Sequence, residues 1–163
     1  ENVLRASVVI SPFMHALVGA PFDAGDNPQV AAQFSVQYSI ACAIERRMLG
    51  IAEIQNEVIA DARLNSLAQK VSVSVNDSWG GEFAPCDLEI QTTDGRRISH
   101  HVEYTPGTPH NPVSLDDLKA KFRDCVASGI RPMSTAQCET AIETVLAIDE
   151  LDNMKGVFDF ATR

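Results

Sequence analysis

The pattern of apolar and polar positions predicts four β-strands within the first 104 residues. Residues 3–10 (VLRASVVI) are rich in β-branched residues, as strands are. Residues 71–75 (VSVSV) alternate strictly, which would turn Val71, Val73 and Val75 toward a core. Two further alternating stretches follow at residues 86–92 and 97–104. Together these stretches predict a small antiparallel sheet.

The last two predicted strands are expected to pair as a hairpin, and their apolar faces decide the length of its loop. A two-residue turn would put Ile90 opposite Ser99, an apolar position against a polar one. A three-residue loop at residues 93–95 puts Ile90 opposite Ile98 instead. It also places Gly95 where a left-handed backbone is favoured. The pattern therefore predicts the three-residue loop.

Helical patterns fill the region between the first two predicted strands. Residues 29–48 combine an alternating stretch with several alanines and a charged end, and we interpret them as one mostly buried helix. Asn27 could cap this helix, with Pro28 at its first position. Residues 51–69 predict two short helices that meet near Asp61.

Prolines mark the passage from the hairpin to the end of the chain. Three of them lie between residues 106 and 112, and each restricts its own backbone and that of the preceding residue. We therefore expect an extended strap here. Beyond it, Ser114 and Ser134 each begin an amphipathic helix with a capping pattern, and a short helix from about residue 153 closes the chain.

These elements predict an α+β fold, with a small antiparallel sheet packed with helices and further helices at the C-terminus. We expect the α+β part to occupy residues 1–130 and a helical segment to occupy residues 131–163. With 163 residues and 45% hydrophobic composition, the chain can bury one substantial core.

Charge and composition exclude several classes of partner. Thirteen basic side chains against 22 acidic ones give a net charge of −9, which argues against binding to nucleic acid or to an anionic membrane surface. Apolar runs fall short of the about 20 residues that cross a bilayer. The early apolar stretch is interrupted by Pro12 and His15 and does not resemble a signal peptide. Because the chain begins with Glu1, we expect it to have been cut from a longer protein.

Residue types that bind metals or act as nucleophiles do not fall at a recognised spacing. His100 and His101 are neighbours on a predicted strand, so they point to opposite faces and cannot chelate one ion together. The four cysteines are far apart without a C-x-x-C pair, and we expect reduced, mostly buried thiols in a cytoplasmic protein. Glycine-rich phosphate loops are absent from the sequence. We predict no metal and no organic cofactor.

Three stretches in order resemble the MmgE/PrpD family, which includes 2-methylcitrate dehydratase, cis-aconitate decarboxylase and iminodisuccinate epimerase. The first, AAQFSVQYSIACAI, is similar to the family's A-x-F-S-x-x-Y-x-x-A segment at Ala32, Phe34, Ser35, Tyr38 and Ala41. The second, LEIQTTDGRRISHHVEYTPGTPHNPVS, resembles its strand, D-G-R turn, strand and proline-bearing strap. The third is the helix DDLKAKFRDCV. The resemblance runs from near residue 1 to about residue 150.

The resemblance implies the C-terminal portion of a longer enzyme. Residues 1–130 would be a lid-type small domain, and residues 131–163 would pack on a large helical domain. Family members remove water or carbon dioxide from small di- and tricarboxylates, or invert a centre in them, generally without a cofactor, and we expect a homo-oligomer. The family's lysine and histidine, from a K-x-Y-P-x-C-x-x-x-H type of segment, have no match here. This chain alone is therefore expected to lack turnover.

Tyr38 and Ser35 are the residues that match a family motif and could face the substrate cleft. The resemblance implies that Tyr38 contributes a hydroxyl there, and the alternative is a helix tyrosine with its ring in the core. Ser35 is better interpreted as a packing or hydrogen-bonding residue.

Two other functions stay open from the sequence. One is a stand-alone, non-catalytic binding or oligomerisation module that covers its exposed apolar surface by self-association. The other is a metal-binding protein that uses His100, His101 and His110.

Overall fold

The computed structural model describes residues 2–81, 83–154 and 157, and the chain divides into the compact units Glu1–Pro112 and Val113–Arg163. The elements of the first unit are β1 (Val3–Ile10), α1 (Pro12–Val18), α2 (Pro28–Gln33), α3 (Val36–Arg46), η1 (Ala52–Ile54), α4 (Asn56–Ile59), α5 (Ala62–Ala68), β2 (Val71–Val75), β3 (Cys86–Thr92) and β4 (Arg97–Val102). Those of the second unit are α6 (Leu115–Ala127), α7 (Thr135–Leu146) and η2 (Ile148–Glu150). The sequence analysis divides the chain differently, into a lid-type domain at residues 1–130 and a helical segment at residues 131–163. That division refers to the domains of a longer protein, and it stays a prediction.

The strands form one four-stranded sheet in the order β2-β1-β3-β4. β1 pairs antiparallel with β3, and β3 pairs antiparallel with β4. β1 and β2 are parallel, with Ala6 opposite Val71 and Ile10 opposite Val75, so the sheet is mixed rather than wholly antiparallel. The connection between these two strands carries all the helices from α1 to α5, and it is long enough for the crossover that a parallel pair needs. The predicted α+β class is confirmed.

The hairpin of β3 and β4 has the predicted register. Ile90 lies opposite Ile98, and Leu88 lies opposite His100. Gly95 adopts a φ of 86°, in the left-handed region that the three-residue loop requires. The apolar pattern of two strands was enough to set this pairing, because a one-residue slip would have turned every side chain to the other face.

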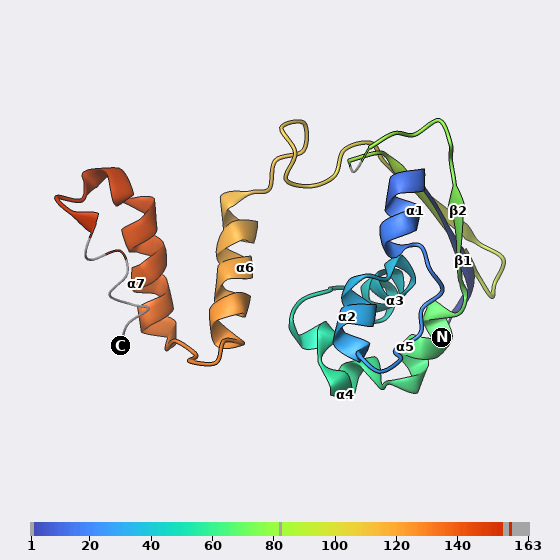
Figure 1. Ribbon diagram of the computed structural model, residues 1–163, viewed down its shortest axis with the longest axis horizontal. Helices are drawn as coiled ribbons and strands as arrows, with labels where there is room; N and C mark the ends of the chain where they lie inside the picture. The colour runs from blue at the N-terminus through green and yellow to red at the C-terminus, as the bar shows by residue number, and fades with distance from the viewer. Residues whose placement is uncertain (1, 82, 155–156, 158–163) are drawn as a thin grey trace. The chain divides into compact units, whose positions relative to one another are not determined.

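Helices of the first unit gather on one side of the sheet (Figure 1). β1 turns Ala6, Val8 and Ile10 to this side with the period of two expected of a strand, and they form a cluster with Val71. A second cluster, called here the helical core, lies among the helices themselves. Its buried members are Phe22, Ala32, Tyr38, Ala41, Cys42, Ile59, Leu64, Leu67 and Ala68.

The single helix predicted over residues 29–48 is wrong, because the chain breaks into α2 and α3. The break falls at Phe34 and Ser35, where Ser35 is extended with φ −130° and ψ 114°. The Ser35 Oγ accepts a hydrogen bond from the Tyr38 backbone N–H at 3.1 Å, which satisfies a donor at the start of α3. Pro28 begins α2 as predicted, but the Asn27 side chain makes no capping hydrogen bond.

The prediction that all three valines of β2 face a core is only partly right. Val71 is buried, Val73 is half-buried and Val75 is exposed. β2 lies at the edge of the sheet, so its residues have a neighbouring strand on one side only.

The predicted extended strap is also wrong, since the chain there closes into a compact loop. Gly107 donates a backbone hydrogen bond to the Asn111 carbonyl at 2.8 Å, and Thr108 and Asn111 form an isolated β-bridge. Gly107 has a φ of 94°, which lets the backbone reverse between the prolines. Tyr104 packs against His110 across this loop, with ring centroids 4.7 Å apart.

The two capped helices that the sequence predicts after the proline-rich segment are present as α6 and α7 of the second unit. The Ser114 Oγ accepts from the Asp117 N–H at the start of α6, and Ser134 and Gln137 form a complete capping box at the start of α7. Arg123 of α6 donates two hydrogen bonds to the Glu139 carboxylate of α7, at 2.6 and 2.8 Å. The helix predicted from about residue 153 lies largely outside the described residues.

Candidate functional site

Ser35 and Tyr38 lie one turn apart at the beginning of α3. Ser35 is 3% exposed, and its side chain caps the helix through the backbone of Tyr38. On α3 the buried positions Tyr38, Ala41 and Cys42 follow helical spacing and turn into the helical core. Ser35 is therefore the hydrogen-bonding residue that the sequence favoured.

The Tyr38 side chain is fully buried, with 0% of its surface exposed. Its hydroxyl donates a hydrogen bond to the Glu53 backbone carbonyl at 2.6 Å, and its ring packs on Phe22 with centroids 4.9 Å apart. Burial raises the pKa of the Tyr38 hydroxyl, and the neighbouring Cys42 thiol adds to the rise. The hydroxyl is thus a protonated donor at neutral pH. Its predicted contact with a substrate stays a prediction.

Glu53 is a buried residue that the sequence analysis did not single out. It is 4% exposed, and its carboxylate Oε2 accepts from the Gly50 backbone N–H at 2.9 Å. Its backbone carbonyl receives the Tyr38 hydroxyl, so η1 and α3 are joined through these two residues. A single glutamate in a short turn carries no sequence signal for such a position, because its partners come from elsewhere in the chain.

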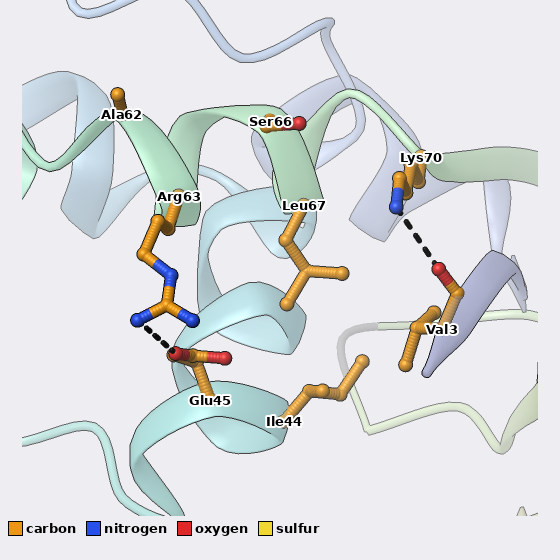
Figure 2. A pocket seen from close by; sticks show the side chains of 8 residues that line it. All are labelled: Val3, Ile44, Glu45, Ala62, Arg63, Ser66, Leu67 and Lys70. Carbon is orange, nitrogen blue, oxygen red and sulfur yellow. Dashed lines mark hydrogen bonds and ion pairs between the residues drawn. The ribbon is translucent and has the colours of Figure 1, made fainter. Parts of the chain in front are cut away.

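A pocket of about 290 Å³ opens between α3, α5 and the first residue of β1. We call it the α3–α5 pocket, and it is lined by Val3, Ile44, Glu45, Ala62, Arg63, Ser66, Leu67 and Lys70. Figure 2 shows the Leu67 side chain between two polar contacts at the rim. On one side an Arg63 guanidinium nitrogen lies 3.8 Å from a Glu45 carboxylate oxygen, and on the other the Lys70 ammonium donates to the Val3 carbonyl at 3.0 Å.

The local sequence explains how α5 builds its side of the pocket. The predicted helix boundary at Asp61 is confirmed, since the Asp61 carboxylate accepts from the Arg63 N–H at 2.8 Å and α5 starts at Ala62. Positions 62, 63, 66, 67 and 70 follow the helical spacing of three and four residues. Because Ala62 and Ser66 are short, space remains between the longer side chains.

The histidines do not come together. His100 lies opposite Leu88 and is exposed, while His101 makes contacts of 2.6 Å to Asp87 and 2.8 Å to Glu103. Over residues 2–81, 83–154 and 157, no group of three or more histidine, cysteine, aspartate or glutamate side chains has the arrangement of a metal site.

The pKa of His101 is expected to lie above the ordinary histidine value. Hydrogen bonds to Glu103, and then to Asp87, raise the pKa of His101. Its contribution to stability is therefore complete below the unfolded pKa of about 6.5 and is lost as pH rises through the folded pKa. An NMR titration of the His101 ring should show Glu103→Gln lowering its pKa, while Glu57→Gln on α4 leaves it in place. Titration of the unaltered chain at or below pH 6.5 would contradict this expectation.

The cysteines are all free thiols in the structure, and one of them is an exception to the mostly buried set that the sequence predicts. Cys42 and Cys138 are buried and Cys86 is half-buried, but Cys125 is exposed on α6. Burial raises the pKa of both Cys42 and Cys86, which keeps these thiols neutral. Cys125 is exposed because its side of α6 is not covered within the second unit.

The mixed sheet with helices on one side, followed by capped helices, defines an α+β domain. In a comparison with protein families, the sequence model of the MmgE/PrpD C-terminal domain matches residues 8–148 of the chain. The chain therefore belongs to the MmgE/PrpD family and represents its C-terminal portion, as the sequence motifs indicated. A comparison with curated proteins finds no match. Within the described residues, no helix has both the length and the apolar character needed to cross a membrane.

Proposed function

We propose that the chain is the lid-type C-terminal part of a MmgE/PrpD lyase or isomerase that acts in the cytoplasm on small di- and tricarboxylic acids. The reaction would be dehydration, decarboxylation or epimerisation, through proton abstraction next to a carboxylate. Other parts of a longer, homo-oligomeric protein would complete the substrate cleft, without a metal or organic cofactor. The observation that carries the proposal is the family match over residues 8–148.

Tyr38 is proposed to supply a hydroxyl to this cleft, while Ser35 holds the start of α3. The raised pKa of Tyr38 keeps its hydroxyl protonated, which supports a role as a neutral hydrogen-bond donor rather than as a base. The hydroxyl would have to exchange its bond to the Glu53 carbonyl for one to substrate. Rearrangement of the turn at η1 is the simplest way to release it.

Residues 1–163 alone are expected to show no turnover of 2-methylcitrate or cis-aconitate. The reason is that no segment of this sequence matches the family's lysine- and histidine-bearing motif. The same residues, put in place of the C-terminal domain of an active family member, should restore turnover of that enzyme's carboxylate substrate. NMR would follow product formation by the isolated chain, by the chimera and by the intact enzyme.

Substantial turnover by the isolated chain would overturn the expected lack of activity. A chimera that folds and assembles like the intact enzyme, yet is inert toward its substrate, would count against the proposed function itself.

The second candidate is a non-catalytic oligomerisation module. It is favoured by an apolar groove of about 310 Å³ between α6 and α7, where Leu115, Leu118, Val145 and Leu146 are each about half exposed. Self-association would remove this surface from water. Sedimentation at several concentrations separates the two ideas, since a chain that stays monomeric throughout would remove this candidate.

A further inference from the structure

The rim of the α3–α5 pocket carries the positive charge of Lys70, and the group that Lys70 contacts there is neutral. Lys70 donates to the backbone carbonyl of Val3, a neutral group that uses one of the three N–H donors of an ammonium. Among the described contacts of Lys70, none is with a carboxylate. An anion entering the pocket would therefore meet a full positive charge with donors to spare.

The opposite side of the rim limits how many negative charges a ligand can carry. There the Arg63 guanidinium already lies beside the Glu45 carboxylate, at 3.8 Å. A second carboxylate on the ligand would approach Glu45, and like charges at short range repel. Figure 2 shows Lys70 at one end of the rim and the Arg63–Glu45 pair at the other. The rim is thus suited to one carboxylate, at the Lys70 end.

The floor of the pocket is apolar and suits a short hydrocarbon chain. Leu67 is 8% exposed, and Ile44 and Val3 are half-buried. Each methylene that a ligand buries here should tighten binding about fourfold. The volume of about 290 Å³ lies at the small end of the range for ligand pockets, which restricts the ligand to a small molecule.

From these contacts we propose that the α3–α5 pocket binds a small aliphatic monocarboxylate. The carboxylate accepts hydrogen bonds from Lys70, and the hydrocarbon part lies on Leu67, Ile44 and Val3. This ligand class differs from the di- and tricarboxylates of the proposed function, and the pocket contains neither Tyr38 nor Ser35. The inference therefore stands or falls independently of the proposed reaction.

The test uses isovalerate as the probe and the ¹⁵N-labelled chain of residues 1–163. Isovalerate should shift the amide signals of Ile44, Leu67 and Lys70 in a saturable way. Isovaleramide, a neutral molecule of nearly the same shape, should bind at least about tenfold more weakly, because it cannot form the charge-assisted bond to Lys70. Succinate should also bind more weakly than isovalerate, because of its second carboxylate.

Two substitutions test whether the carboxylate binds to Lys70 itself or responds only to the net charge of the protein. Lys70→Gln should weaken isovalerate binding about tenfold or more, whereas Lys121→Gln, an exposed lysine on α6, should leave it unchanged. Ser66→Leu, at an exposed helical position, should abolish binding by filling the pocket.

Several outcomes would overturn the proposal. They are the absence of saturable shifts around the pocket, equal affinity for isovalerate and isovaleramide, and tighter binding of succinate. Unchanged isovalerate affinity in a folded Lys70→Gln protein would show that Lys70 does not bind the carboxylate.

Discussion

Replacing Leu64 with alanine should lower the free energy of unfolding of the first unit by about 2–5 kcal/mol. Leu64 is fully buried on α5, within the helical core that also contains Tyr38 and Ile59. The substitution removes apolar surface from the core and leaves a cavity that close-packed neighbours fill only in part. Because small domains are stable by only about 5–15 kcal/mol, this change should be among the most damaging single substitutions in the chain.

Urea unfolding followed by the fluorescence of Trp79 would measure the loss. Trp79 is the only tryptophan in the sequence and lies in the first unit, so its signal does not mix the unfolding of the two units. Leu17→Ala is the matched control, because Leu17 is 50% exposed on α1 and should cost only about 0.5 kcal/mol. Equal losses in the two variants would mean that Leu64 does not support the core.

Tyr38→Phe should lower the free energy of unfolding by about 1–3 kcal/mol. The substitution keeps the ring against Phe22 but removes the hydroxyl, which leaves the buried Glu53 carbonyl without this donor. Tyr104→Phe is the control, because Tyr104 is 45% exposed in the proline-containing loop and should change stability little. The same Trp79 measurement applies to both. A Tyr38→Phe protein as stable as the unaltered one would contradict the hydrogen bond to Glu53.

The same pair of variants separates packing from chemistry when placed in the active chimera. If Tyr38 supplies a hydroxyl to the substrate cleft, Tyr38→Phe should lower kcat by about tenfold or more at a temperature where both proteins are folded. Tyr104→Phe should leave kcat unchanged. An undiminished kcat in Tyr38→Phe would assign this tyrosine to the core alone.

Predictions from the sequence succeeded where a pattern acts between neighbouring strands or within one turn of helix. The hairpin pairing of Ile90 with Ile98 followed from matching two apolar faces. The capping residues Ser114 and Ser134 were recognised because a cap bonds to the backbone three residues ahead. The motif around Ser35 and Tyr38 indicated the family, which the match over residues 8–148 confirms.

Predictions failed at local breaks and reversals that hydrophobic periodicity does not show, and where distant parts of the chain decide the pairing. The residues from 29 to 48 read as one helix, yet Ser35 ends the helical run because its hydroxyl can cap a new one while Tyr38 enters the core. The proline-rich segment looked extended, but Gly107 allows a reversal that the bond to Asn111 then holds. The parallel pairing of β1 with β2 depends on a crossover that no local pattern reveals.

The candidate sites show the same division. Sequence alone identified Tyr38 and Ser35 as motif residues, because their spacing is visible along the chain. Only the tertiary structure showed that the Tyr38 hydroxyl meets the Glu53 carbonyl, fifteen residues away, and that Lys70 bonds to the Val3 carbonyl at one side of the α3–α5 pocket. Periodicity determines which face of an element is buried, whereas burial of a particular polar atom depends on partners that folding brings from elsewhere in the chain.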